Sequence, residues 1–495
     1  MRKFIDVRIA GAAAFVLCLM LMVPSQVFAL DNFLVGARGA GMAGANVACV
    51  NDTTAQYYNP AAFGFMAQQR ELDTDPGNFA WDTNVGVGYR IHENLGKLLD
   101  DLSKIDITEL GANDIQNEAD LQNLTKAAEF ISRLDDSGNA ITFDGNAGTA
   151  VRINNFAIGV RGMMQVSVRV SAIDTTNLGL EVNMATLNAD IVAVTLTGDD
   201  GLTSLFTPAQ QAQLLAAGFT AGAGGSIQKL DYAARQAGIS TGTAELQQAV
   251  DLLGSVAAAT TGTTGGIENN TTSATLEGFG MYEIPISYGR ALNENISIGG
   301  NLKVMKGRVY GTQLVVFKKD SGDIVSEADN NYKETTTFGV DLGAMAKLGK
   351  FNLGIVGRNL NSPEFDGPTV GGTVFKDVSL DPAVTAGVAF MPWNGMTLEC
   401  DYDITKNETA LPGYDTKNIA FGAEWMLIRI LSLRAGMYKN TEESDIGWVY
   451  TAGLGVNMPW VRLELAGAMS ADSSDFDGDS IPEETRVTAQ LSMAF

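Results

Sequence analysis

The chain has 495 residues, of which 45% are hydrophobic, and its formal net charge is −24 at pH 7. Such an acidic balance argues against direct binding of nucleic acid, because phosphates require surfaces rich in lysine and arginine. One histidine and three cysteines are too few for a metal site built from those residue types.

Residues 1–29 are predicted to be a secretory signal peptide. A basic start at Arg2 and Lys3 is followed by an apolar run over residues 10–23 and by a small-residue cleavage site that ends at Ala29. A retained transmembrane helix is the alternative, but Pro24 and the short apolar run disfavour it. No later segment has the ~20 apolar residues of a spanning helix, so the mature chain is expected to leave the inner membrane.

Residues 30–79 are predicted to form a compact N-terminal plug. The stretch VGARGAGMAGANVACVNDTTAQYYNPAAFGF, from Val35 to Phe65, is too rich in glycine and alanine for an ordinary core helix and lacks the alternation of a strand. Its small residues let backbone approach backbone, as in a segment packed inside something narrow. The pair Asn59-Pro60 then predicts a turn, because proline fixes φ and has no N–H group. A flexible leader is the alternative.

This run resembles the N-terminal plug of the FadL superfamily of outer-membrane barrels, and within it the TraF-like group associated with conjugal-transfer operons. The resemblance identifies nine plug positions, namely Gly36, Arg38, Gly41, Gly44, Asp52, Tyr58, Asn59, Pro60 and Ala61. Two positions depart from the family pattern. Asn51 stands where the first of two aspartates is common, and Ala62 stands where the fatty-acid transporters usually have glycine, which weakens inferences about the substrate.

From residue 80 to residue 495 the chain shows period-two alternation in segments of about ten residues. In the segment 461–470, Leu463 and Leu465 face one way and Arg462 and Glu464 the other. The polar faces are largely Gly, Ser and Asn, whereas a soluble sandwich usually exposes Lys, Glu and Thr. An apolar face toward lipid and a polar face toward a lumen are typical of a membrane barrel, which must close so that every backbone polar group is paired.

Fourteen strands are predicted, at 80–91, 146–153, 155–171, 275–290, 295–310, 334–348, 351–360, 382–391, 396–405, 416–426, 430–439, 446–457, 461–470 and 485–495. The predicted fold class is all-β, a transmembrane antiparallel β-barrel of about 14 strands with an N-terminal plug and helical extracellular insertions. Alternate connections are short, which is typical of periplasmic turns, and the others are long. The last strand ends on Phe495 and resembles the C-terminal recognition strand of bacterial outer-membrane proteins.

Two insertions into the barrel of residues 80–495, at about 92–145 and 172–274, are predicted by strand parity to lie outside the cell. In the first, leucines at helical spacing predict helices between residues 94 and 136. In the second, residues 178–197 continue the alternation, helices are predicted at 208–217, 226–237 and 244–257, and residues 260–272 form a linker. The second insertion is long enough for a small cap domain.

Isolated charges on the inward faces are the main candidates for a functional site in the lumen. The ten positions are Glu283, Lys303, Asp341, Arg358, Glu399, Asp401, Glu424, Arg434, Arg462 and Glu464. Their mixed signs allow them to satisfy one another and to hydrogen-bond to a plug. An open, water-filled porin would have a similar pattern, but the plug-like N-terminus favours a blocked lumen.

Catalytic and metal chemistry have little support in the sequence. The single histidine, His92, is predicted to be exposed in a loop, with no serine singled out beside it. Asp475, Asp477 and Asp479 have the spacing of a calcium-binding loop, and the DxDGDxIP run resembles thrombospondin-type repeats. An EF-hand is incomplete, since Arg486 stands at its twelfth position, and a solvated acidic loop is favoured.

Two cysteines remain after the signal peptide. Cys49 and Cys400 lie far apart in sequence and in different predicted elements. Unpaired thiols are therefore expected, and a disulfide formed in an oxidising periplasm is the alternative.

These patterns predict an outer-membrane protein that has both termini in the periplasm and is not an enzyme. The resemblance to FadL-like proteins implies passive uptake of hydrophobic small molecules without a cofactor, from an external apolar site past the plug to a lateral or periplasmic exit. The expected partners are outer-membrane lipid, the hydrophobic ligand and the barrel-assembly machinery, and not nucleic acid. The alternative function is a structural or interaction component of the outer membrane linked to conjugal transfer, without transport.

Overall fold

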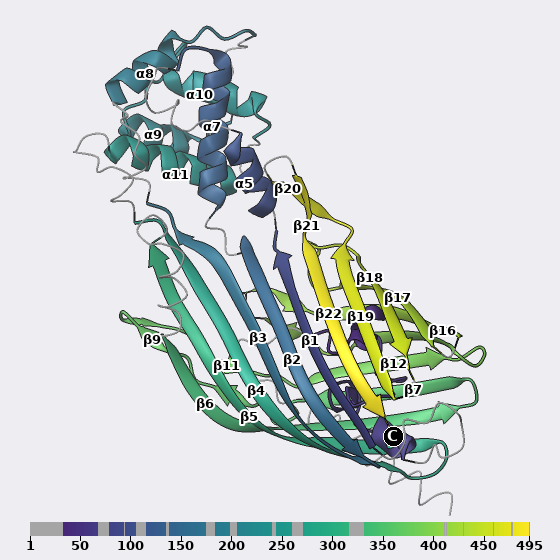
Figure 1. Ribbon diagram of the computed structural model, residues 1–495. Coiled ribbons are helices and arrows are strands. Elements are labelled where there is room, and N and C mark those ends of the chain that lie inside the picture. The colour runs from purple at the N-terminus through teal and green to yellow at the C-terminus, as the bar shows by residue number, and fades with distance from the viewer. Residues whose placement is uncertain are drawn as a thin grey trace, which may run out of the picture.

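The computed structural model describes the chain from residue 33 to residue 494 with several gaps. The described residues are 33–67, 79–93, 95–104, 115–134, 138–174, 184–198, 205–239, 244–259, 271–315, 331–409, 411, 413–428, 430–458, 460–476 and 479–494. The predicted signal peptide and Phe495 lie outside them. Figure 1 shows a tilted barrel with a helical domain at one end and short segments of the early chain inside it.

Fourteen antiparallel strands form one closed barrel, in which β1 pairs with β22 to complete the ring. The strands are β1 (Phe79–Ile91), β2 (Ala140–Ile153), β3 (Phe156–Ala172), β4 (Ser273–Ala291), β5 (Ile296–Val315), β6 (Tyr332–Leu348), β7 (Phe351–Arg358), β12 (Ala383–Phe390), β13 (Met396–Asp403), β16 (Asn418–Ile428), β17 (Leu431–Asn440), β18 (Val449–Asn457), β19 (Val461–Ser470) and β22 (Glu484–Ala494). Each corresponds to one predicted strand, so the predicted fold class is confirmed.

One boundary was predicted wrongly, because β2 begins at Ala140 and not at residue 146. The ladder with β1 continues through Phe143, which pairs with Tyr89, and through Asp144, which pairs with Gly88. Phe143 is exposed on the outer surface and Asp144 is buried inside. The alternation therefore extends into the stretch that had been assigned to the first insertion, where an inward aspartate beside a glycine resembled a loop.

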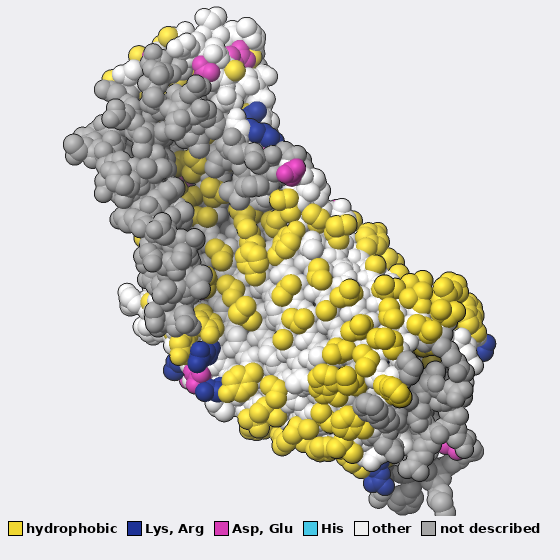
Figure 2. Space-filling view, viewed as in Figure 1, with side chains coloured by type: hydrophobic (Ala, Val, Ile, Leu, Met, Phe, Trp, Pro, Cys, Tyr) yellow, Lys and Arg dark blue, Asp and Glu magenta, His cyan; other side chains and the backbone are white. Residues whose placement is uncertain are grey.

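The outer surface of the barrel is a broad apolar band. Figure 2 shows hydrophobic side chains spread over the strands, with lysines and arginines only at the edges of this face. On β19 the exposed residues are Leu463, Leu465 and Met469, while Glu464 between them is buried. Because lipid offers no hydrogen bonds, a closed barrel with this exterior is suited to an outer membrane, and the band is its surface of contact with lipid.

Replacing Leu465 with arginine is expected to impair barrel formation. Leu465 is 60% exposed at the middle of β19, where an arginine facing lipid costs about 2–4 kcal/mol. The control is Met469→Arg, which is near the end of the same strand and should cost about 0–1 kcal/mol. The folded fraction is measured from the faster migration of unheated barrels on a gel. Equal folding of both variants would contradict the assignment of this face to the bilayer core.

Both insertions together form a single helical cap, which Figure 1 shows at the end of the barrel above β1 to β5. Its helices are α5 (Leu95–Ser103), α7 (Glu118–Arg133), α8 (Met184–Ala193), α9 (Pro208–Ala216), α10 (Ser226–Gln236) and α11 (Ala244–Ala259). Leu121 of the first insertion is buried in one core with Ile191, Leu214, Leu230 and Val250 of the second. None of the described helices is long and apolar enough to span a membrane.

The alternation predicted over residues 178–197 is wrong for its central part, which is helix α8. Leu187, Ile191 and Val194 follow helical spacing and are all buried in the cap core. The apolar residues of this stretch fit both periods, and packing against the cap decides in favour of the helix.

Two segments occupy the barrel interior. The first, here called the inner segment, comprises residues 33–67 and contains α2 (Ala37–Gly41), α3 (Ala55–Tyr58) and α4 (Ala62–Met66). The second, here called the lumen insert, comprises residues 363–380 and contains β8 (Glu364–Phe365), β9 (Thr369–Val370), β10 (Thr373–Val374) and β11 (Val378–Ser379). Two further hairpins, β14 (Asn407–Glu408) with β15 (Asp415–Thr416) and β20 (Ser473–Phe476) with β21 (Asp479–Pro482), extend from the cap end of the barrel.

Candidate functional site

The inner segment follows a tight path that requires glycine. Gly36 and Gly44 have φ angles of 73° and 85°, in the left-handed region that side chains disfavour. Gly41 lies against the wall, since a Cβ there would be 3.1 Å from the Cα of Gly453 on β18. The three predicted plug glycines therefore allow two turns and one close approach to the barrel.

Arg38 joins the inner segment to the wall through a buried chain of ion pairs. Its Nη2 lies 2.8 Å from Oε2 of Glu424 on β16, and only 2% of its side chain is exposed. The other oxygen of Glu424 accepts a bond of 2.7 Å from Arg434 on β17, and Arg434 reaches Glu464 on β19 at 2.6 Å. Such charge-assisted pairs are directional, and the removal of one partner strands a buried charge. Four predicted site residues are thus brought together.

Two carboxylates on β13 bind the backbone of the inner segment. Asp401 accepts the N–H groups of Asn46 and Val47 at 2.8 and 2.9 Å, and Glu399 accepts that of Ala48 at 2.6 Å. These N–H groups belong to an irregular turn and have no helix or strand partner there. The two inward carboxylates therefore replace the hydrogen bonds that a turn buried in the lumen would otherwise lack.

The predicted turn at Asn59-Pro60 is bonded on several sides. The Asn59 amide donates to the carbonyls of Val47, Ala344 and Ile355 at 3.0, 3.2 and 3.3 Å, and its oxygen accepts the N–H of Ala61 at 3.1 Å. The side chain of Asn59 thus binds one inner-segment carbonyl and two carbonyls of the wall. Pro60 then carries the chain into α4.

Tyr58 and Asp52 hold other parts of the inner segment. The Tyr58 hydroxyl accepts the N–H of Val35 at 3.1 Å. Asp52 accepts the N–H of Thr54 at 2.9 Å and the Gln490 amide of β22 at 3.3 Å. The nine residues of the predicted plug motif therefore all lie in the lumen, and Arg38, Asp52 and Asn59 among them bind groups of the wall.

A second charged cluster lies on β3 to β6. Lys303 is 2.9 Å from Asp341 and 3.6 Å from Glu283, and Arg161 is 2.8 Å from Glu283. Beside it, the guanidinium of Arg358 lies 4.6 Å from the ring centre of Tyr57. Arg462, the last of the ten predicted charges, is half-buried on β19 and is not brought into either cluster.

A third cluster was not predicted. Arg486 on β22 lies 2.7 Å from both Asp144 and Glu484, and Arg90 on β1 lies 3.1 Å from Glu484. These charges could have been found in the same way as the others, because they too occupy the inward positions of alternating strands. It was missed because residue 144 was assigned to an insertion and because Arg486 was considered only as a departure from a calcium loop.

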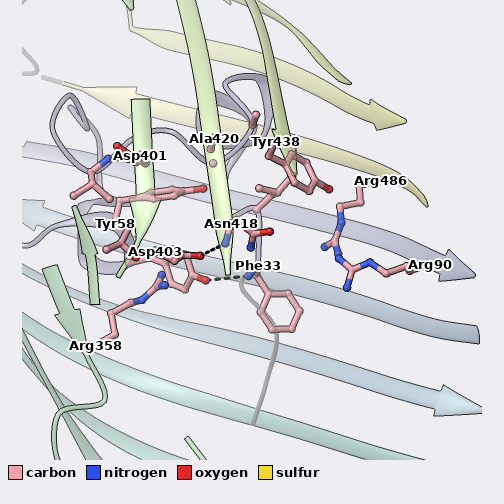
Figure 3. A pocket seen from close by; sticks show the side chains of 16 residues that line it. Phe33, Tyr58, Arg90, Arg358, Asp401, Asp403, Asn418, Ala420, Tyr438 and Arg486 are labelled. Atoms are coloured by element: carbon pink, nitrogen blue, oxygen red, sulfur yellow. Dashed lines mark hydrogen bonds between the residues drawn. The ribbon is translucent and has the colours of Figure 1, made fainter. Parts of the chain in front are cut away.

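A cavity of about 70 Å³ lies between this third cluster and the inner segment. Figure 3 shows Arg90 and Arg486 on one side, Arg358 and Tyr58 on the other, and Phe33 between them. The N–H of Phe33 donates to the Tyr57 hydroxyl at 3.0 Å. The space has room for a few water molecules between the inner segment and the wall.

One side of the lumen is apolar. Inward-facing Met163 on β3, Phe279 and Met281 on β4, and Met305 and Val309 on β5 form a buried cluster on which the lumen insert packs. They lie on the cap side of the Lys303 cluster, because Glu283 and Lys303 are the next inward residues after Met281 and Met305. We call these five residues the apolar patch.

The prediction of an exposed His92 is wrong, since only 1% of this residue is exposed. Its Nε2 lies 3.0 Å from the Thr142 hydroxyl, and its Nδ1 is 3.4 Å from Asp445. Burial lowers the pKa of His92, so the ring is neutral at pH 7. An Asp–His–Thr order resembles a catalytic triad, but Thr142 is only 3% exposed, and these contacts join the end of β1 to β2 and to the loop before β18.

The acidic loop does not form a metal centre among the described residues. Asp479 is exposed on β21, whereas Asp477 and the side chain of Asp475 lie outside the described part of the chain. The calcium hypothesis therefore stays a prediction.

The two cysteines are free. Cys49 belongs to the inner segment, and Cys400 lies on the outward face of β13 because its neighbours Glu399 and Asp401 are buried inside. The barrel wall separates the two thiols, so they do not pair, as the sequence predicted.

Thiol labelling of the purified, folded protein tests the position of the inner segment. In a Cys49→Ala, Cys400→Ala background, Ala61→Cys should resist a bulky maleimide because Ala61 is fully buried. The control, Val374→Cys, should label rapidly, since Val374 is 73% exposed at the tip of the lumen insert. Equal labelling rates would contradict a stably held inner segment.

No curated protein was found to match this sequence. Among solved structures, the barrel is similar to a deletion mutant of the monoaromatic hydrocarbon channel TodX (10% identity, 93% of this chain and 99% of that chain covered, TM-score 0.45). It is also similar to the toluene transporter TodX of Pseudomonas putida (10% identity, 94% and 99% covered, TM-score 0.43). A FadL homologue of Pseudomonas aeruginosa shows 12% identity, 94% and 99% coverage and a TM-score of 0.41.

Sequence comparison with family models gives a more direct assignment. The matching model is described as "F plasmid transfer operon, TraF, protein", and the match spans residues 56–403, from α3 of the inner segment to the end of β13. It covers well over half of the chain and includes the Tyr58-Asn59-Pro60-Ala61 turn, which is the last part of the run that carries the resemblance. The protein therefore belongs to the TraF family of the F plasmid transfer operon.

Proposed function

We propose that this protein is a plugged outer-membrane channel for the passive uptake of hydrophobic small molecules. The apolar patch is the observation that carries the proposal, because the lumen of a water-filled pore is polar. Three of its five side chains are methionines, namely Met163, Met281 and Met305. Methionine is unbranched and polarizable, so such a surface adapts to apolar ligands of different shapes.

The inner segment is the plug in this proposal. Its backbone is bound by Asp401 and Glu399, and its Arg38 is bound by Glu424, all from the wall. These polar contacts are numerous, but each is local, so that the segment is able to shift without unfolding the barrel. A shift of the inner segment would connect the apolar patch to the part of the lumen that the segment now fills.

A short interruption in the hydrogen-bond ladder between β3 and β4 supports a lateral exit. The ladder between β3 and β4 runs from Phe156 to Ile158 and resumes only at Arg161. Pro285 faces this gap and has no N–H group to donate. The side chain of Gln56, from the inner segment, closes it by donating to the Pro285 carbonyl at 3.1 Å. Withdrawal of the plug would therefore also remove the bond that Gln56 makes at this interruption.

Uptake of a lipophilic fluorescent dye by cells tests the proposal. Met281→Gln places an amide of similar shape in the apolar patch, and a buried amide without a partner costs ~1–3 kcal/mol. Uptake should fall about tenfold, which corresponds to ~1.4 kcal/mol. The control is Met281→Leu, which stays apolar and should retain uptake. If cells with the parent protein take up no more dye than cells without it, the transport proposal fails.

The second candidate is a structural or interaction component linked to conjugal transfer. Two observations favour it, namely the description of the family and a helical cap with its own core. Deleting the cap helices while keeping the barrel separates the candidates. Loss of conjugation with dye uptake unchanged would favour the second function, and the reverse result would favour the first.

We also propose that the barrel-assembly machinery engages the last strand. Deletion of Phe495, which follows β22, should lower the amount of folded barrel while export to the periplasm continues, because β22 closes the ring against β1. Membrane fractionation measures both quantities, and addition of a residue after Phe495 is the matched control for a changed terminus. Unchanged membrane levels in the deletion variant would contradict the proposed role.

A further inference from the structure

The lumen insert places an aromatic ring on the apolar patch. Phe365 of β8 is fully buried, and its ring centre lies 4.8 Å from that of Phe279 on β4. Because β8 pairs with β11, Val378 and Leu380 reach the same apolar cluster. The patch is thus covered by a loop that enters from the rim and not by the wall itself.

Gly307 on β5 provides the space for this ring. A Cβ at position 307 would lie 2.6 Å from Cδ1 of Phe365 and 2.7 Å from Cε2 of Phe279, so only glycine lets the two rings meet there. Two inward positions further along, beyond Val309, Gly311 faces the ring of Phe375 in the same way. Two glycines on one inward face therefore form two hollows, each filled by a phenyl ring of the lumen insert.

The lumen insert is held together mainly by its own hydrogen bonds. Leu380 N–H donates to the Pro363 carbonyl at 3.0 Å, and Gly367 N–H donates to Asp377 at 2.7 Å. Two of its polar links to the wall are at the rim, where Asp366 lies 3.2 Å from Lys333 and its N–H donates to the Thr335 hydroxyl at 3.1 Å. Both rim links are solvent-exposed, and exposed pairs of this kind contribute little to stability. The lumen insert is therefore attached to the wall mainly through its buried apolar side chains, among them Phe365 and Val378.

We propose that Phe365 is an internal substitute for the ligand. The hollow formed by Gly307, Phe279, Met281 and Met305 is a binding site for an apolar molecule with a ring of phenyl size, and the ligand enters by displacing Phe365 from it. This inference rests on the proposed uptake function and specifies its substrate class and first binding site. The flat floor at Gly307 and the ring of Phe279 favour an aromatic ring over a flexible alkyl chain of equal carbon number.

Displacement has a measurable consequence for affinity. When the site is occupied by Phe365 most of the time, the apparent dissociation constant is raised by the inverse of the fraction that is open. A variant without the ring should therefore bind the ligand more tightly, and a variant in which the lumen insert is locked to the wall should bind it less.

The experiment uses the purified full-length barrel and 4-fluorotoluene, observed by ¹⁹F NMR, with ethylbenzene and n-octane as competitors. Thr335→Cys with Asp366→Cys, in a Cys49→Ala, Cys400→Ala background, forms a disulfide that locks the lumen insert. Oxidation should weaken binding at least tenfold and reduction should restore it, so that the same sample is its own control. Phe365→Ala should tighten binding at least tenfold. Ethylbenzene should compete at least tenfold better than n-octane, which has the same number of carbon atoms.

The locked variant decides the case, because a cavity made by Phe365→Ala alone would attract rings in any apolar core. If the oxidised and reduced forms bind equally, the ligand uses another site and this inference is overturned, while the uptake function stands. If n-octane competes as well as ethylbenzene, the assigned substrate class is wrong. If neither the parent nor Phe365→Ala binds the probe, and dye uptake is also absent, the proposed uptake function itself fails.

Discussion

Replacing Gly299 with leucine is expected to turn a nearly silent barrel into a steady ion conductor. Gly299 faces inward on β5, and a Cβ there would lie 2.6 Å from the backbone nitrogen of Ala61 and against the carbonyl of Pro60. Two hydrogen bonds hold the inner segment against the wall at this point, since Ser297 binds the Ala61 carbonyl at 2.6 Å and Asn301 binds the Gln56 carbonyl at 2.7 Å. A leucine therefore prevents the inner segment from packing against β5 at Pro60 and Ala61.

The expected size of this effect is large. Overpacking typically costs about 1–3 kcal/mol, and a side chain that meets the backbone of Pro60 and Ala61 belongs at the upper end of that range. Because ~1.4 kcal/mol changes a population tenfold, a plug that is displaced about 1% of the time in the parent would be displaced for a large part of the time in the variant. The barrel itself should persist, since the strand ladders on both sides of β5 are unaffected.

Planar-bilayer recordings measure the conductance, and Gly162→Leu is the matched control. Gly162 lies on the outward face of β3, and its nearest neighbours are backbone oxygens 3.9 Å from an added Cβ. It should remain as silent as the parent. If the parent already conducts like an open porin, the inner segment is not a plug. If Gly299→Leu stays silent, the segment does not close the conducting path.

The barrel was predictable because lipid and lumen impose a strict alternation on every strand. Leu463, Glu464 and Leu465 show both faces within three residues, and the pattern recurs in all fourteen strands. The pairing of Glu424 with Arg434 also follows from the strands, since the two residues are directly opposed in the ladder between β16 and β17. Short hairpins fix that register, so their contact needed no knowledge of the lumen.

Contacts of the inner segment with the wall were beyond such reasoning. Arg38 binds Glu424 and not another inward carboxylate because of the path that the segment takes through the lumen, and no periodicity encodes that path. The motif of small residues indicated a packed segment but not its partners. The turn at Asn59 was predictable from Pro60, whereas the two wall carbonyls that it binds were not.

The lumen insert was missed for a different reason. Its strands are two residues long, which is too short for any alternation, and Phe365 occurs in a loop rich in Gly, Pro and Asp. The inward glycines Gly307 and Gly311 of β5 did not indicate it, because other strands also have inward glycines, such as Gly422 and Gly436. His92 was misjudged similarly, since its burial depends on Thr142 and Asp445, which belong to different loops and strands.

Asn59→Ala should open the channel because it removes hydrogen bonds that hold the inner segment, whereas Gly299→Leu acts through a steric clash. The substitution removes three donated hydrogen bonds, to Val47, Ala344 and Ile355, and the bond accepted from Ala61. Each buried group left without a partner costs ~1–3 kcal/mol, although such losses are not additive. Unlike leucine at position 299, alanine at position 59 does not obstruct the wall, so the inner segment is able to return to its original position. The recordings should therefore show brief openings separated by silent periods, with closed times that shorten as urea is added.

Asn361→Ala is the matched control for this variant. The Asn361 side chain also bonds to backbone, donating to the Phe338 carbonyl at 2.7 Å and accepting the Val340 N–H at 2.9 Å, but it does so on the exposed rim of the barrel. Its loss should leave the conductance at the parent level, because water replaces both partners. Brief openings in both variants would indicate a general loosening of the barrel. Openings in Asn59→Ala alone, with the gel migration of the folded barrel unchanged, would place the weak point at the contact between the inner segment and the wall strands β6 and β7, since Ala344 and Ile355 are the wall residues that Asn59 binds.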